Sequence, residues 1–343
     1  MGTTKIQSSK KKRPDLLVIA GEHSGDQNIA QYIKELKEAH LELVIYAFGG
    51  KCLSEAGARL LFDMTKFSVV GLSEVIAKYF FFKKLLNRIL AWIKRNKPRT
   101  VCLVDYPGLN LRIAEALFRK KLSQKSGGSI RVVYYTSPQI WAWKKRRRFL
   151  LEKYVDSLGT IFEFEKGCYN DTSLDVEFVG HPFKREEIEN YVAYSTTAPV
   201  LLLPGSRIPA IRKIFPAMLK CFREFSKSEQ TKMATVMYAS DQALHLMRRI
   251  LNKRFSDLKG KVSFIPDSRK VEACATLMSS GTMSLKCCLA GIPGAILYKS
   301  ASLTYLVGKY FLKIKRLGIA NILLKKKAWP EFIQGDIRPK IIA

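Results

Sequence analysis

The sequence predicts an α/β protein with two domains, each built on a doubly wound parallel sheet. Apolar segments of strand length alternate with amphipathic segments of helix length, the pattern of parallel sheets covered by helices. The alternation starts a second time near residue 199, and 343 residues are too many for one ordinary core. We therefore expect two domains that face each other across a cleft.

The first domain is predicted to span residues 15–183, after a basic tail over residues 1–14. Its strands are expected in five apolar segments, the last of which is the weakest. A Gly/Ser loop and an amphipathic helix follow the first segment, which is the usual opening of an α/β unit. In chain order the segments are DLLVIA, LELVIYAFGG, RTVCLVDYPGLN, RVVYYTSPQIW and SLGTIFEF.

The second domain is predicted to span residues 199–343, after a polar linker at 184–198. The stretch that contains the linker is prone to form a helix, and the lysine-rich segment from residue 301 is also expected to be helical. The apolar segments of this domain are PVLLLPGSR, TKMATVMYAS, KVSFIPD and ATLMSSGTMSLKCCLAGIPGAILYKS.

The net charge of +30 exceeds what solubility requires, which points to a polyanionic neighbour: nucleic acid, an anionic membrane or a phosphorylated substrate. The seven cysteines are scattered and show no CxxC spacing, so we expect a reducing compartment and no structural metal. The amino end is polar and basic, unlike a secretory signal. These observations favour a cytoplasmic protein.

The stretch VLLLPGSR, which ends at residue 207, suggests a diphosphate clamp. A strand that ends in Gly205 and Ser206 and leads into a helix offers backbone N–H groups and the positive end of the helix dipole to an anion. The guanidinium of Arg207 binds phosphate oxygens in a bidentate manner. The alternative is a tight turn with a surface arginine, which the tetrapeptide alone supports equally well.

A second loop of the same kind stands at 279–285, SSGTMSL, again after an apolar strand and before a helix. Ser280, Gly281 and Thr282 are candidates to bind the other end of a nucleotide diphosphate or its ribose. The alternative is that these hydroxyls only cap the helix. Two such loops in one domain favour a nucleotide.

In the first domain, DYPGLN supplies the candidate catalytic base. Asp105 follows an apolar strand at its carboxyl end, where open α/β sheets place their ligands. The alternative is an aspartate that caps the next helix. The loop GEHSGD lacks the G-x-G-x-x-G spacing of dinucleotide-binding folds, so we interpret it as a substrate loop. The candidates on the acceptor side are Ser24, Gly25, Asp26 and Asn110.

Residues 67–93 are unusually apolar, but charged residues interrupt them too often for a membrane span. An amphipathic helix that lies on an anionic membrane fits this pattern, and an ordinary core helix is the alternative. The basic and aromatic stretch WAWKKRRRF suits phosphate or lipid headgroups, or is simply a solvated face. The residues expected at the membrane are Val69, Val70, Phe80, Phe81 and Phe82.

Taken together, these motifs resemble the lipid-A-disaccharide synthase family of inverting glycosyltransferases, which have the GT-B architecture of two Rossmann-like domains. The similarity runs almost from end to end of the chain, and several collinear motifs are more specific than any single one. In order they are GEHSGD, FGG at 48–50, GLSEV at 71–75, DYPGLN, YYTSPQIWAWKKRR, FVGHPF at 178–183, LLPGSR, SSGT, NIL at 321–323 and WPEFIQ at 329–334.

The resemblance implies that UDP-2,3-diacylglucosamine donates its sugar to the 6-hydroxyl of 2,3-diacylglucosamine 1-phosphate. It implies a peripheral enzyme on the inner face of the cytoplasmic membrane in lipid A biosynthesis, and it leaves a homodimer open. Asp105 would be the base, the loops at Arg207 and Gly281 would hold UDP, and Asn321 and Gln334 are similar to family positions near the donor. No metal or cofactor is expected, because these groups neutralise the diphosphate.

Two positions depart from the family pattern. Ala210 and Lys286 stand where relatives usually carry acidic residues, and the second of those commonly accepts hydrogen bonds from the ribose. The chain also ends at Ala343, before a helical segment that is usual in the family. A catalytically weakened homologue that binds the same ligands at the membrane is therefore the second hypothesis. A nucleic-acid-binding protein, which charge alone suggests, is the third.

Overall fold

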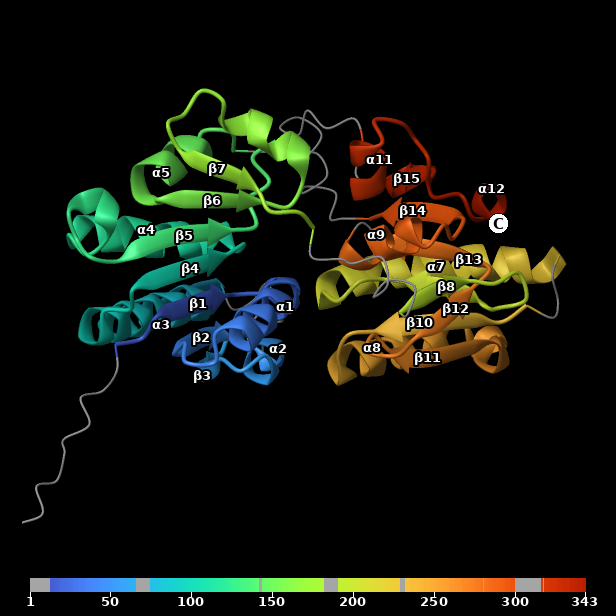
Figure 1. The fold of residues 1–343 in the computed structure, drawn as a ribbon. Helices are drawn as coiled ribbons and strands as arrows, with labels where there is room; N and C mark the ends of the chain where they lie inside the picture. The colour runs from blue at the N-terminus through green and yellow to red at the C-terminus, as the bar shows by residue number, and fades with distance from the viewer. Residues whose placement is uncertain are drawn as a thin grey trace, which may run out of the picture. The chain divides into compact units, whose positions relative to one another are not determined.

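A computed structural model describes residues 13–65, 75–141, 144–181, 191–228, 232–279, 281–299, 316 and 318–343. The chain divides into two compact units, Met1–Pro182 and Phe183–Ala343 (Figure 1). Each unit contains one main parallel sheet with helices packed on it, so the predicted α/β class with two doubly wound sheets is confirmed.

The sheet of unit 1 has seven parallel strands in the order β3-β2-β1-β4-β5-β6-β7. This order places the first strand in the middle of the sheet, as in Rossmann folds. The strands are β1 Leu16–Ala20, β2 Ile45–Gly49, β3 Arg59–Asp63, β4 Thr100–Val104, β5 Arg131–Tyr135, β6 Ser157–Thr160 and β7 Asp175–Phe178.

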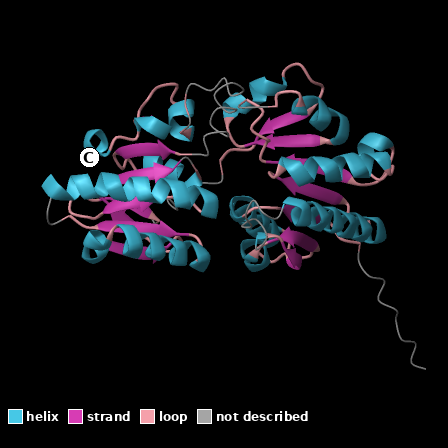
Figure 2. Cartoon of the chain, turned by 180° about the vertical axis from the view of Figure 1, so that it is seen from behind, coloured by secondary structure: helices cyan, strands magenta, loops and turns pink. Residues whose placement is uncertain are grey.

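Successive side chains of β1 are buried on opposite faces of this sheet, which explains its continuous apolar sequence. Leu17 and Ile19 belong to the core under α3 and α4, whereas Val18 and Ala20 belong to the core under α1. Helices therefore cover both faces (Figure 2). The helices are α1 His23–Ala39, α2 Lys51–Glu55, α3 Val75–Asn96, α4 Pro107–Arg119 and α5 Arg147–Tyr154, with 3₁₀ turns η3 Gln124–Ser126 and η4 Glu163–Tyr169.

The sheet of unit 2 has six parallel strands in the order β11-β10-β9-β13-β14-β15. Its strands are β9 Val200–Leu203, β10 Ala234–Tyr238, β11 Val262–Pro266, β13 Ala275–Ser279, β14 Gly294–Tyr298 and β15 Glu331–Ile333. The helical elements are α7 Ile208–Ser228, α8 Asp241–Arg254, η5 Ser256–Lys261, α9 Thr282–Leu289, α11 Ile319–Leu323, η6 Gln334–Asp336 and α12 Pro339–Ile342.

The core of unit 2 forms where α7 and α8 pack on β9 and β10. Ile211, Phe215 and Met218 recur at helical spacing on α7 and are fully buried against Leu202 and Val236 of the sheet. This packing fixes the start of α7 directly beyond the end of β9.

Both sheets have a switch point where the strand order reverses its direction. It lies between β1 and β4 in unit 1 and between β9 and β13 in unit 2. In open α/β sheets, ligands bind outside the carboxyl ends of the strands at such points. The residues that follow these four strands are therefore the first place to look for chemistry.

The structure adds the short strands β3, β7 and β15 to those that the sequence predicts, together with a small parallel pair of β8 Val192–Tyr194 with β12 Val271–Ala273. Half-exposed edge strands carry a weak apolar pattern, and the strands of the pair are three residues long. Strand β8 falls inside the predicted linker, in a stretch that the sequence suggested is prone to form a helix. The helix expected from residue 301 lies largely outside the described residues.

Among the helices that the structure describes, none combines the length and the apolar character needed to cross a bilayer.

Candidate active site

Asp105 directly follows β4, at the switch point of unit 1, in a strained backbone conformation. Asp105 and Tyr106 both have φ of +44°, and Tyr106 is the N-cap of α4. Left-handed backbone at non-glycine residues costs about 1–3 kcal/mol each and persists only where the surroundings impose it. Two such residues in a row, at the position where open α/β sheets generally bind ligands, suggest a functional turn.

Three hydrogen bonds hold the backbone of Asp105 in this conformation. Its N–H donates to the carbonyl of Tyr135 on β5 (3.1 Å). Its carbonyl accepts from the hydroxyl of Tyr134 (2.5 Å) and from Nδ2 of Asn110 (2.8 Å). Burial, together with the charge of Asp105, raises the pKa of Tyr134, so this hydroxyl stays protonated as a donor.

Asn110, which the sequence suggested as a contact on the acceptor side, is a positioning residue in this structure. It is fully buried, and its Nδ2 also donates to the carbonyl of Val104 (3.0 Å). Gly21, at the end of β1, completes the switch point, because a Cβ there would lie 2.4 Å from Cδ1 of Tyr106. A glycine at position 21 is thus required for the turn beside it.

Glu165 is a second carboxyl group near Asp105, and the sequence analysis missed it. The residue is 2% exposed and lies in η4, beyond the carboxyl end of β6. Burial raises its pKa to about 7, although the N–H of Phe162 donates to its Oε2 (3.2 Å) and opposes the shift. The charge of Asp105 raises the pKa further. The only signal in the sequence was an acidic residue soon after a strand.

We expect the Glu165→Gln variant to gain stability relative to the native protein as the pH rises. The native carboxyl keeps its proton to about pH 7, whereas in the unfolded chain it ionises near 4.5. The glutamate therefore loses its stabilising contribution between these two values, by about 3 kcal/mol in total. Urea unfolding at pH 5 and pH 8 measures this difference. A stability difference independent of pH would contradict the assignment.

The loop GEHSGD is shorter than predicted. Residues from His23 onward already form α1, so Ser24, Gly25 and Asp26 belong to its first turns. Asp26 is fully buried, and its carboxylate accepts the N–H groups of Gly50 (2.6 Å) and Cys52 (3.0 Å). This aspartate therefore ties α1 to the start of α2. Whether Ser24 and Gly25 contact an acceptor stays a prediction.

The Gly205 loop of unit 2 stands at the second switch point. Gly205 has φ of +88°, and a Cβ there would lie 3.1 Å from Oγ of Ser279 at the end of β13. The positive φ favours glycine, and the nearby hydroxyl leaves little room for a side chain. Ser206 and Arg207 are exposed, directly before the first residue of α7. A glycine turn, an arginine and the positive end of a long helix therefore follow one another at the end of β9, and anion binding by this loop stays a prediction.

The second predicted loop lies beside the first, because β9 and β13 are adjacent and parallel. Gly281 is the N-cap of α9, and its N–H donates to Oγ of Ser284 (3.2 Å), which in turn donates to its carbonyl (2.6 Å). An anion at this helix would therefore meet the amides that follow Gly281. Ser280 and the side chain of Thr282 lie outside the described residues.

Asn321 and Gln334 differ in what they can offer a ligand. Asn321 is fully buried, and its Nδ2 donates to Oε1 of Glu331 (2.7 Å) and to the carbonyl of Trp329 (2.7 Å). Its Oδ1 accepts the N–H of Trp329 (3.0 Å). These bonds make it a support for β15. Gln334 directly follows β15 with φ of +52°. The Gly205 loop follows β9 on the same side of the sheet, where the parallel strands have their carboxyl ends. Gln334 is thus the better candidate for direct contact.

The two positions that depart from the family pattern lie on the two anion-loop helices. Ala210 is in the first turn of α7, where its N–H donates to the carbonyl of Arg207 (3.0 Å). Nζ of Lys286, on α9, lies 4.0 Å from the centroid of the Tyr191 ring, in a cation–π contact. In this structure the lysine packs on an aromatic ring.

The predicted membrane residues divide into two groups. Phe80 is 62% exposed on α3, whereas Phe81 and Phe82 pack against the core of unit 1. The ring centroids of Phe82 and Tyr106 lie 6.0 Å apart, and Tyr106 is the residue after the candidate base Asp105. For Phe81 and Phe82 the alternative of a core helix is therefore the better description. Val69 and Val70 lie outside the described residues.

Within the described part of the chain, no three His, Cys, Asp or Glu residues gather in a way that could hold a metal ion.

Comparison with known proteins supplies the family context. A family model described as lipid-A-disaccharide synthetase matches residues 16–343. Lipid-A-disaccharide synthase 1 of Legionella pneumophila (strain Lens) is 35% identical over 334 residues, which cover 94% of this chain and 84% of the relative. The synthase of Coxiella burnetii (strain RSA 331 / Henzerling II) is 33% identical over 341 residues, or 96% and 86% of the two chains.

Among solved structures, UDP-GlcNAc 2-epimerase of Methanocaldococcus jannaschii in complex with UDP-GlcNAc and UDP is similar with a TM-score of 0.58. The alignment covers 95% of this chain and 90% of that one at 13% identity. The structure of UDP-GlcNAc 2-epimerase from Neisseria meningitidis is similar with a TM-score of 0.55, and the alignment covers 90% of each chain at 14% identity. At such identities the similarity establishes the fold alone.

Proposed function

This chain belongs to the lipid-A-disaccharide synthase family, and from that membership we propose that it transfers 2,3-diacylglucosamine from UDP to 2,3-diacylglucosamine 1-phosphate. The products are the β(1→6)-linked disaccharide 1-phosphate and UDP. The observation that carries the proposal is the position of the family motifs: DYPGLN and PGSR follow the strands at the switch points of the two sheets. These are the positions from which such folds bind their ligands.

Asp105 serves as the general base in this proposal. Its carboxylate takes the proton of the acceptor's 6-hydroxyl as that oxygen attacks the anomeric carbon of the donor sugar. The bond between the anomeric carbon and the diphosphate oxygen breaks, and UDP leaves with the bonding electron pair. Attack from the face opposite the leaving group inverts the anomeric configuration. The restrained backbone of Asp105 keeps the base in place through the reaction.

Unit 2 binds the donor in this proposal. Arg207 and the N-terminus of α7 neutralise the charge that develops on the departing diphosphate, and the N-terminus of α9 supports them. We assign Gln334 to the nucleotide because it directly follows β15 at the carboxyl end of that strand. Fixed positive groups of this kind perform the task without a metal ion.

Incubation of the protein with both acylated substrates tests the proposal. We expect UDP to appear only when donor and acceptor are both present, together with a product of the mass of the acylated disaccharide phosphate. Omission of the acceptor is the control. Release of UDP at the same rate without acceptor would contradict transfer and indicate hydrolysis of the donor.

A catalytically weakened homologue is the second candidate, and Ala210 and Lys286 favour it. Neither side chain accepts a hydrogen bond from a ribose, and the lysine packs on Tyr191. Tight binding of UDP or of the acceptor, with no UDP release from the pair of substrates, would establish this candidate in place of the enzyme.

For the membrane, we propose that the exposed part of α3 contacts anionic lipid through Phe80 and the exposed Lys83 and Lys84. The Phe80→Ser variant is expected to bind phosphatidylglycerol vesicles about tenfold more weakly, because it lacks the aromatic side chain that we propose is buried in the lipid when the protein binds. Leu41→Ser, at an 81% exposed position of the same unit, is the matched control. Equal vesicle binding by both variants and the native protein would exclude this contact.

A further inference from the structure

A cavity of about 320 Å³ lies in unit 2, outside the residues assigned to UDP. We call it the α7 cavity, because most of its lining comes from one side of that helix. Other contributors are the end of α8, the residue after β14 and the segment that leads into α12. The lining residues are Arg212, Lys213, Pro216, Ala217, Lys220, Arg254, Lys299, Ile337 and Pro339.

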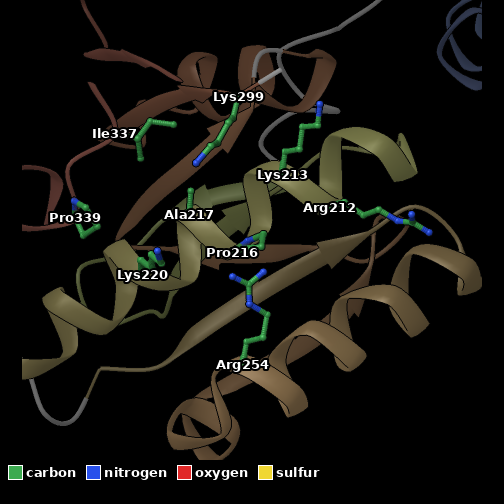
Figure 3. Close-up of a pocket in the computed structure, with 9 residues that line it drawn as sticks. All are labelled: Arg212, Lys213, Pro216, Ala217, Lys220, Arg254, Lys299, Ile337 and Pro339. Atoms are coloured by element: carbon green, nitrogen blue, oxygen red, sulfur yellow. The ribbon is translucent and has the colours of Figure 1, made fainter. Parts of the chain in front are cut away.

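The lining is strongly cationic and has no acidic member. Five of the nine residues are lysine or arginine, and the remaining four are proline, alanine and isoleucine. Figure 3 shows the guanidinium of Arg254 and the ammonium of Lys299 directed toward the part of α7 that carries Pro216 and Ala217. The head group of Arg212 points away from that part in the same view.

None of these five cationic side chains makes a hydrogen bond or an ion pair with the described residues. Two cationic residues farther along α7 do have carboxylate partners. Nη2 of Arg223 lies 2.7 Å from Oδ1 of Asp257, and Nζ of Lys227 lies 2.8 Å from Oε1 of Glu224. The hollow is therefore lined by cations that have no carboxylate partner among the described residues, whereas Arg223 and Lys227 of the same helix have one.

Like charges around one hollow repel each other, and an anion placed among them relieves the repulsion. Lysine and arginine both bind phosphate oxygens, arginine in a bidentate manner. A volume of this size holds more than a simple inorganic ion, and the apolar side chains offer a surface for carbon groups. The chemistry that fits is a phosphate group attached to, or accompanied by, a small organic part.

We propose that the α7 cavity binds a phosphate-bearing anion, at residues separate from those that hold UDP. The source of the phosphate is either a soluble phosphate compound or the headgroup of an anionic lipid. The proposal does not depend on transferase activity, since its site shares no residue with the Gly205 loop, Gly281 or Gln334.

The test measures binding of inorganic pyrophosphate by calorimetry at low ionic strength, in an Arg207→Ala background that weakens the candidate donor site. The pocket variant combines Lys220→Gln, Arg254→Gln and Lys299→Gln. The control variant combines Arg249→Gln, Lys253→Gln and Lys259→Gln, three exposed positions of unit 2 outside the cavity lining. Both variants lose the same net charge.

We expect the pocket variant to bind pyrophosphate about tenfold more weakly than the control, since three close cations are removed. Binding to phosphatidylglycerol vesicles is measured in parallel. Loss of pyrophosphate binding supports a soluble ligand, and selective loss of vesicle binding supports a lipid headgroup. Equal binding by the pocket and control variants in both assays would overturn the proposal, because the anion would then respond to the net charge of the protein and not to the lining of the α7 cavity.

All six substituted residues are exposed or lie at the surface of helices, so both variants are expected to fold. Thermal melting checks this. If the pocket triple variant melts early, the single variants Arg254→Gln and Lys299→Gln replace it, each with an expected loss of about threefold. Single variants that bind both probes like Arg249→Gln would equally overturn the proposal.

Discussion

The Asp105→Asn variant is expected to lose between about 10² and 10⁴ of the transfer rate while it retains its affinity for UDP. Asparagine has nearly the same shape as aspartate and tolerates the left-handed backbone that position 105 adopts. The substitution therefore removes the proton acceptor and leaves the turn intact. Steady-state kinetics with both substrates measures the rate, and calorimetry measures UDP affinity.

Asp175→Asn is the matched control for this variant, because Asp175 is an exposed acid of the same unit on β7. The Asp175→Asn variant should transfer sugar at the native rate. A loss confined to kcat in the Asp105 variant, with its melting temperature unchanged, supports the role of a base. A turnover within a few fold of the native value would remove Asp105 from that role.

The Arg207→Ala variant is expected to bind UDP about ten- to a hundredfold more weakly, because hydrogen bonds to charged groups contribute about 1.5–3 kcal/mol. The exposed arginine stands between the Gly205 turn and α7, where we propose that its guanidinium and the helix end act on the same anion. Calorimetric titration with UDP measures the loss.

Arg207→Lys distinguishes charge from geometry at the same position. Lysine keeps the positive charge but lacks the planar fork, so partial recovery of UDP affinity is expected. Arg249→Ala, an exposed arginine on α8, is the control and should bind UDP normally. If Arg207→Ala and Arg249→Ala bind UDP equally well, the Gly205 loop is not the diphosphate site.

Much of the fold was predictable because its central strands are continuous apolar segments. Strands β1, β4 and β9 are buried on both faces, so their sequences contain little else than apolar residues. Strands β3 and β7 stand at the two ends of the seven-stranded sheet and are half-exposed, which leaves only a weak pattern.

The candidate site was predictable to the extent that its residues follow strands directly. Asp105 and Arg207 could be placed at the carboxyl ends of parallel strands from the sequence alone. The left-handed turn at Asp105, however, depends on Asn110 and on the hydroxyl of Tyr134, and the pattern of residues does not show such contacts.

Burial by residues distant in sequence explains the remaining differences. Glu165 is buried by its tertiary surroundings, and nothing in its local sequence predicted a raised pKa. The position of Asp26 in a Gly/Ser stretch suggests a substrate residue, but in the structure its carboxylate accepts the N–H groups of Gly50 and Cys52 at the start of α2. Phe81 and Phe82 looked like membrane contacts because the sequence does not show which face of α3 meets the core.

The anomeric configuration of the product tests the central claim most directly. Donor labelled with ¹³C at its anomeric carbon is incubated with acceptor and protein, and the product is examined by NMR spectroscopy. The proposed displacement predicts a β-linked disaccharide phosphate, formed in equal amount to the UDP released. UDP accompanied by free acylated glucosamine, or an α-linked product, would contradict the displacement that we assign to Asp105 and Arg207.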